Sequence, residues 1–115
     1  MSERNIRVNE LLKREISEVL HTRYKDETVY ITILGVQTSP DHRKAHVYFS
    51  VIGGEKQAKP SLNWLTRHQK EIRREVGRKI VLKFLPHLQF HYDPSTEKGD
   101  QVINLLNELE ENDPH

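Results

Sequence analysis

Basic residues concentrate between positions 67 and 83, and phosphate binding is the chemistry they suggest first. In this stretch only Glu71 and Glu75 are acidic, against seven bases: Arg67, Lys70, Arg73, Arg74, Arg78, Lys79 and Lys83. On a helix four of these bases share one face, because residues three and four apart are neighbours: Lys70, Arg73, Arg74 and Arg78. Cations so close repel one another unless they share an anion, and the planar fork of arginine fits a phosphate. The stretch therefore predicts a phosphate-binding surface; the alternative is a face that only keeps the protein in solution.

Other residues bear on the same kind of partner. Arg4 and Arg7, near the start of the chain, are weaker candidates for phosphate contacts. Tyr30 and Tyr48 lie in predicted strands, and aromatic side chains on a sheet can stack on bases. The paired aromatic signature of an RNA-recognition-motif sheet is absent, however. We therefore expect the protein to read the backbone and shape of an RNA rather than its sequence.

Signals for an enzyme or a metal site are weak. His87 and His91 share one face of a predicted strand with Asp93, but residues four apart on a strand are separated by about 13 Å, too far for two ligands of one ion. Ser50 and His46 also share a strand face, without an orienting acid or an oxyanion hole. No glycine-rich phosphate loop is present. We expect no catalytic residue, no metal, no cofactor and no small-molecule substrate; the alternative is a small histidine or metal hydrolase.

The net charge of +1 conceals an uneven distribution. Residues 94–115 contain six acids and one base, which leaves 17 bases and 11 acids, a net of +6, in residues 1–93. A basic body with an acidic end indicates an anionic partner, and nucleic acid is the first candidate.

Length and composition limit the remaining possibilities. The 115 residues, 35% hydrophobic and 30% charged, suit one globular domain. There is no cysteine, which fits a reducing cytosol. No apolar run approaches the roughly 20 residues of a membrane helix, and Met1 leads into charged residues rather than a signal peptide. We expect a cytoplasmic monomer with no membrane partner.

The first half of the chain predicts a helix followed by a hairpin. Apolar residues at three- and four-residue spacing predict a helix over residues 4–22. Alternating β-branched and aromatic residues predict strands over residues 28–38 and 45–51. Ser39-Pro40-Asp41 is a turn signal between the strands, and Gly53-Gly54 ends the second one.

The second half predicts a helix, a strand and a final helix. Ser61 is expected to cap a helix that begins at the next residue. The apolar repeat fails at His68-Gln69, where a break would divide this helix into two. Alternation predicts a third strand from Ile80 to Tyr92, bent or left unpaired at Pro86. Apolar residues near the end of the chain suggest a short helix with an acidic surface. The order predicts an α+β domain in which helices cover one face of a three-stranded sheet.

Three groups of residues carry a family resemblance that runs nearly the whole chain. They lie in the hairpin, the basic helix and the last strand: Val36-x-x-Ser39-x-Asp41-x-x-x-Ala45-x-Val47-Tyr48, Ile72-Arg73-x-x-x-Gly77, and Leu82-Lys83-x-x-Pro86-x-Leu88-x-Phe90-x-Tyr92-Asp93. Lys25-Asp26, Ser95 and Gly99 fit as well. As an ordered set they resemble the ribosome-binding factor A family.

The resemblance implies a fold of the K-homology type II kind over residues 1–96, followed by an acidic helix or tail over residues 97–115. In that family an Ala-x-Gly interruption kinks the second long helix, and by alignment it falls on His68, Gln69 and Lys70. Neither alanine nor glycine is present there. Either other residues make the kink, or the helix continues.

The resemblance also implies a function. Members of the family resemble non-catalytic assembly chaperones that bind the immature 30S subunit near the 5′-end helix of 16S rRNA and leave when maturation is complete. They matter most in the cold. The partners expected from it are 16S rRNA and the 30S subunit. The alternative is a K-homology-like module that acts on a different RNA.

Overall fold

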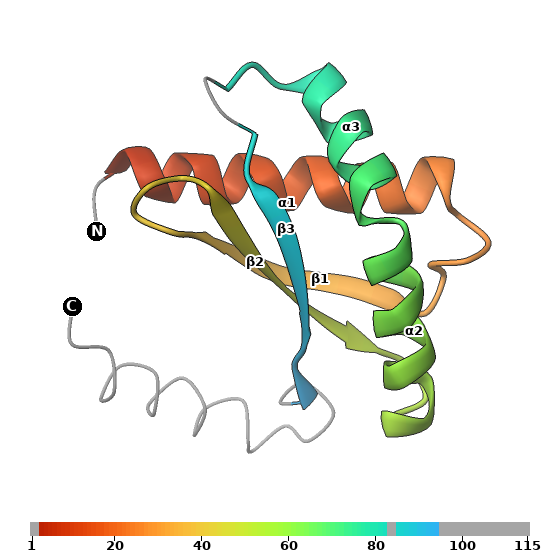
Figure 1. The fold of residues 1–115 in the computed structure, drawn as a ribbon. Helices are drawn as coiled ribbons and strands as arrows, with labels where there is room; N and C mark the ends of the chain where they lie inside the picture. Colours follow the sequence, from red (N-terminus) through yellow and green to blue (C-terminus); the bar gives the residue numbers. More distant parts are fainter. Residues whose placement is uncertain (1–2, 83–84, 95–115) are drawn as a thin grey trace, which may run out of the picture.

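The computed structural model describes residues 3–82 and 85–94, with side chains from residue 6 onward. The elements follow one another as α1 (Glu3–Arg23), β1 (Ile31–Thr38), β2 (Lys44–Val51), α2 (Glu55–Arg67), α3 (Gln69–Lys79) and β3 (His87–Tyr92) (Figure 1). The predicted α+β class and the α-β-β-α-α-β order of a K-homology type II domain are thereby confirmed. The predicted C-terminal helix, in residues 97–115, lies outside the described residues, as does Lys83.

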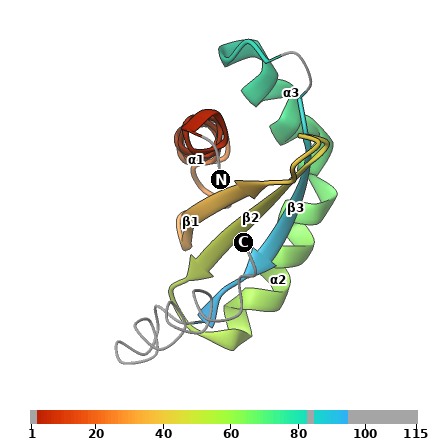
Figure 2. The same cartoon turned by 90° about the vertical axis from the view of Figure 1, so that its left-hand side faces the viewer.

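The strands form one sheet in the order β1-β2-β3. The hairpin strands β1 and β2 are antiparallel, whereas β3 returns parallel to β2. A parallel return needs a crossover, which α2 and α3 provide, and α2 runs beside β3 (Figure 2). The loop of the hairpin is the predicted turn, since the His42 N–H donates to the Ser39 carbonyl at 2.9 Å.

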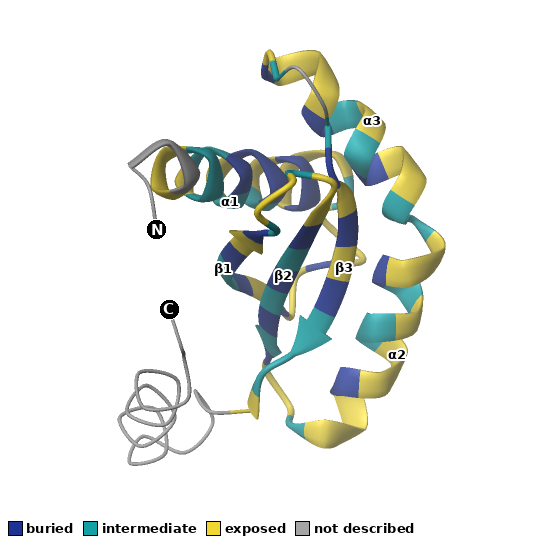
Figure 3. Cartoon of the chain, turned by 60° about the vertical axis from the view of Figure 1, so that its left-hand side comes forward, coloured by how far each residue is buried: buried dark blue, intermediate teal, exposed yellow. Residues whose placement is uncertain are grey.

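The core lies on one face of this sheet. Alternate strand residues such as Val47, Phe49 and Phe90 are buried, and they pack with Leu12 and Ile16 of α1 (Figure 3). The intervening residues lie on the opposite side, which we call the outer face, where some are half-buried, such as Tyr48 and His91, and others are exposed, such as Gln89. The strand pattern read from the sequence therefore predicts correctly which side chains face the helices.

The second helix begins earlier than predicted. It starts at Glu55 after Gly54, so Ser61 lies inside it rather than at its cap, and Pro60 is in its second turn. The first turn, Glu55–Lys59, offers little apolar pattern because Ala58 is its one buried residue. Its residues are nevertheless good helix formers, and Pro60 this near the start removes a single backbone hydrogen bond.

The helix break falls where the apolar repeat failed. A single residue, His68, with φ −98° and ψ 7°, separates α2 from α3. Its backbone N–H donates to the Trp64 carbonyl at 3.0 Å, its Nδ1 lies 2.8 Å from the same oxygen, and its ring stacks on Trp64 with centroids 4.1 Å apart. The break is therefore centred on a histidine that contacts a tryptophan of α2, without alanine or glycine at residues 68–70.

The third strand is shorter than predicted. It spans only His87–Tyr92, whereas Ile80 ends α3 in an extended conformation and Val81 is almost fully exposed. The ladder with β2 starts at the pair Lys44 and His87, beyond which β2 has no residues to offer. The alternation between Ile80 and Pro86 is thus not part of the sheet.

Candidate nucleic-acid interface

Three exposed cations surround the helix break. Arg67 closes α2, and Lys70 and Arg74 lie one turn apart on α3. The opposite side of α3 is anchored in the core by Ile72 and Val76, both fully buried. Within residues 3–82 and 85–94, none of the three cations has an ion-pair partner. We call Arg67, Lys70 and Arg74 the basic face.

Neither acid of α3 forms an ion pair with the basic face. Glu71 accepts a hydrogen bond at 3.0 Å from the hydroxyl of Tyr24, the residue that follows α1. Partial burial of the ring and the Glu71 carboxylate both raise the pKa of Tyr24, so its hydroxyl stays protonated and continues to donate. Glu75 lies 3.2 Å from Arg23 and 2.9 Å from Arg78. The positive charge of the basic face is therefore left for an external anion.

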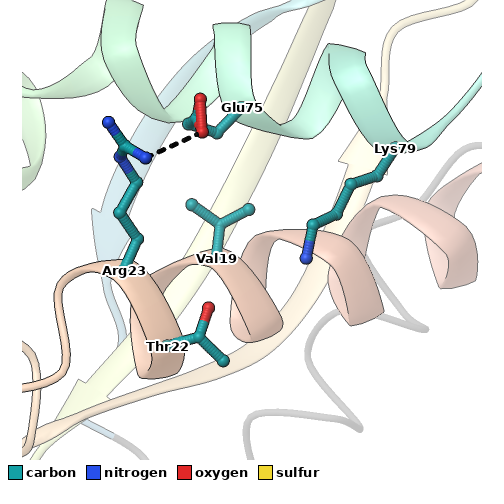
Figure 4. Close-up of a pocket in the computed structure, with 5 residues that line it drawn as sticks. All are labelled: Val19, Thr22, Arg23, Glu75 and Lys79. Atoms are coloured by element: carbon teal, nitrogen blue, oxygen red, sulfur yellow. Dashed lines mark ion pairs between the residues drawn. The ribbon is translucent and has the colours of Figure 1, made fainter.

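Arg78 and Lys79 take part in the contact between α1 and α3. Arg78 shares Glu75 with Arg23, and the Lys79 ammonium lies 3.0 Å from Glu18. Arg23, Glu75 and Lys79 line a shallow pocket of about 320 Å³ together with Val19 and Thr22 (Figure 4). Because their charges are partly satisfied within the protein, Arg78 and Lys79 are weaker candidates for phosphate contacts than the basic face.

The Arg73 side chain is held by hydrogen bonds within the protein, although the sequence groups it with the other bases of this helix. Its Nε donates to the Pro86 carbonyl at 3.0 Å, and one Nη donates to the Leu85 carbonyl. These bonds connect α3 to the segment that leads into β3. RNA binding by Arg73 stays a prediction. At least two of the N–H groups of its side chain already donate to these carbonyls.

We expect Arg73→Ala to destabilise the fold by about 2 kcal/mol, because it removes a charged donor from two carbonyls and leaves them unpaired. Arg74→Ala, one residue along on the exposed side, is the matched control and should change the free energy of unfolding by less than about 0.5 kcal/mol. Urea denaturation of both variants provides the measurement. Equal stability of the two would show that the Arg73 bonds contribute nothing.

A groove of about 530 Å³ runs along β3 beside the helix break. Thr66 and Gln69 line it from the helices, Lys44 from β2, and residues 87–91 from β3. Thr66 and Gln69 are each followed in sequence by a cation of the basic face, Arg67 and Lys70. The basic face and the groove therefore adjoin each other at the helix break.

One donor in the groove wall has no partner. The Gln69 Nε2 is buried and makes no hydrogen bond among the described residues. Buried amides are normally paired, so this donor is an exception within the part of the chain that the structure describes. The sequence predicted the break at this residue but neither the groove nor the position of Lys44 in its wall. Both depend on the pairing of β3 with β2, which no local pattern specifies.

The remaining predicted residues are not brought to the basic face. Arg7 is exposed on the first turns of α1, and Arg4 lies in the same helix. Tyr30 is exposed just before β1, whereas Tyr48 is half-buried on the outer face of the sheet. Among the residues with described side chains, no three histidine or acidic groups lie close enough to hold a metal ion. No described helix is both long and apolar enough to cross a membrane.

Sequence comparisons place this arrangement among known proteins. The family model described as ribosome-binding factor A matches residues 4–106. A protein of that name from Opitutus terrae is 43% identical over 114 residues, which cover 99% of this chain and 93% of the relative. Another from Dictyoglomus thermophilum is 38% identical over 111 residues, or 95% of this chain and 92% of the relative.

Solved structures show the same fold. The crystal structure of ribosome-binding factor A from Thermus thermophilus is similar with a TM-score of 0.69 and 22% identity, over 76% of this chain and 94% of that one. A homology model of the Thermus thermophilus protein, fitted into the cryo-EM map of its complex with the 30S subunit, is similar with a TM-score of 0.60 and 24% identity, over 74% of this chain and 90% of that one.

Proposed function

The chain belongs to the ribosome-binding factor A family, and we propose that it is a non-catalytic assembly factor that binds the immature 30S ribosomal subunit in the cytoplasm. The observation that carries the proposal is the basic face: Arg67, Lys70 and Arg74 are exposed around the helix break, while the neighbouring acids contact Tyr24 and Arg23. A similar protein, that of Thermus thermophilus, has been placed in a complex with the 30S subunit.

The arrangement suits RNA that is partly single-stranded. Cations on a helix face neutralise phosphates without reading the bases, and they make binding dependent on salt. The groove beside them combines the polar side chains of Lys44, Thr66 and Gln69 with apolar ones from β3, such as Phe90, so it offers a base both polar and apolar contacts. The protein would hold a strand of rRNA by its backbone and sample its bases only locally.

A more specific proposal concerns the step of ribosome assembly that the protein assists. We infer that the bound RNA belongs to 16S rRNA and that binding favours late maturation, including processing of its 5′ end. A protein that stabilises one RNA conformation without chemistry helps most where wrong helices persist longest, which is at low temperature. The acidic segment 97–115 is proposed either to limit non-specific RNA binding or to face a protein neighbour.

Sedimentation with ribosomal particles tests the proposal. The purified full chain should co-migrate with free 30S subunits in a sucrose gradient at low salt, but not with 70S ribosomes, and raising the salt should release it. If it stays at the top of the gradient at low salt, binding to the small subunit is refuted. Binding to free mRNA or tRNA in preference to subunits would instead support a module for a different RNA.

A further inference from the structure

Two rings of the outer face of the sheet lie against each other next to the groove. Tyr48 of β2 and His91 of β3 are paired in the parallel register, and their rings stack with centroids 5.3 Å apart and planes 28° apart. Both side chains are half-buried. From the sequence, Tyr48 is a candidate for base stacking but His91 is not, because only the pairing of β3 with β2 brings the two rings together.

A second histidine fixes the position of His91. The Nδ1 of His46 and the Nε2 of His91 are 2.9 Å apart, and the two rings lie 5.1 Å apart. A hydrogen bond between two ring nitrogens needs one of them as acceptor, so at least one imidazole is neutral. Partial burial and the charge of His46 lower the pKa of His91, which favours His91 as the neutral ring at pH 7.

The β1 side of Tyr48 is open. Its partner on β1 is Gly35, next to a register shift in the ladder. Apart from its chain neighbours Leu34 and Val36, a Cβ added at Gly35 would meet no atom within 4 Å, so no residue from another element occupies the space at this glycine, beside the tyrosine. A ligand that approaches Tyr48 from this side would not displace the core, which lies on the opposite side of the sheet.

The charge around these rings favours an anionic ligand. None of the three strands contains an acidic residue; the nearest acids along the chain, including Asp41 and Asp93, lie beyond the strand ends. Lys44 and His87 occupy one paired position at the groove end of the same two strands. A polyanion on the outer face would therefore meet no carboxylate from the strands themselves.

We propose that Tyr48 and His91 form a stacking platform for an unpaired nucleobase, supplied by the same RNA strand that occupies the groove. His91 also lines the groove, so the platform continues it around the edge of β3. Aromatic and histidine rings on sheets accept bases by stacking, which needs no particular base. The inference rests on the proposed RNA-binding function and adds a second, non-electrostatic contact to it.

The test measures how tightly the full-length protein binds a fluorescent single-stranded RNA of about ten nucleotides, a length typical of such sites, over a range of salt concentrations. Tyr48→Leu keeps apolar bulk but removes the ring, and it should weaken binding about tenfold with an unchanged slope of log K against log salt. Tyr48→Phe should bind like the parent. Gly35→Val, which fills the open space and leaves both rings in place, should also weaken binding.

Ser50→Ala, on the same strand and face, is the matched control and should bind like the parent. If Tyr48→Leu and Gly35→Val bind like the parent, the platform is refuted, whatever the basic face does. If the parent fails to bind the oligonucleotide but still co-migrates with 30S subunits, the platform is again refuted while the proposed function stands. Loss of both kinds of binding would overturn the proposed function itself.

Discussion

The double variant Lys70→Glu/Arg74→Glu is expected to bind 30S subunits roughly 100-fold more weakly than the parent at moderate salt. Each exposed cation that neutralises a phosphate releases counterions, and reversing its charge adds repulsion to that loss. Both side chains are exposed and have no ion-pair partner within the described part of the chain, so folding should not suffer. Binding measured between about 50 and 200 mM salt should show a slope reduced by about two.

Lys56→Glu/Lys59→Glu is the matched control, because it changes the net charge by the same amount at the other end of the α2–α3 segment. Both lysines are exposed, and about 14 residues separate Lys56 from Lys70, or roughly 20 Å along helices. We expect this variant to lose only the modest affinity that follows from its net charge. If the two double variants weaken binding equally, the basic face has no special role.

This choice of residues differs from the one that the sequence suggests. On the sequence alone Lys70, Arg73, Arg74 and Arg78 are equivalent members of one helix face. Side-chain contacts divide them, because Arg73 donates to carbonyls near Pro86 and Arg78 shares Glu75 with Arg23. A variant that reversed all four charges would damage the fold and the proposed interface together, so its loss of binding would not identify the cause.

The fold was predictable where one local pattern sufficed. The apolar stripe of α1 and the alternation in β1 and β2 each place a continuous set of side chains against one core, so periodicity alone gives the element and its buried face. The break at His68 was also visible, since an interrupted stripe means that the helix axis changes direction. The stacking of His68 on Trp64 at this break could not be predicted from the sequence.

The start of the second helix and the length of the third strand were predicted wrongly, because the local sequence pattern at each place has more than one possible cause. Pro60 and Ser61 look like a helix start, but the polar residues before them are helical because Gly54 allows the turn and the sequence beyond Glu55 favours a helix. Ile80 to Pro86 alternates like a strand, yet β2 has no residues left to pair with it. The groove and the ring pair also required knowledge of which strands are neighbours.

Adjacent residues of β2 face opposite sides of the sheet, so substitutions at Phe49 and Tyr48 should affect different properties. We expect the first to lower the stability of the fold and the second to weaken RNA binding. Among the residues with described side chains Phe49 is the largest that is fully buried, so Phe49→Ala should cost about 3–5 kcal/mol of unfolding free energy. A small domain has only about 5–15 kcal/mol in total, so much of this variant should be unfolded near physiological temperature.

Tyr48→Ala, one residue earlier, faces the outer side and should cost less than about 1 kcal/mol, because it leaves no cavity in the core. Calorimetry and RNA binding at low temperature should therefore rank the two variants in opposite orders. Phe49→Ala should melt far earlier but bind RNA normally while it is folded, whereas Tyr48→Ala should melt near the parent and bind weakly. A Tyr48→Ala variant that is as unstable as Phe49→Ala would mean that Tyr48 supports the core, and its weak binding would then follow from lost structure rather than from a lost stacking contact.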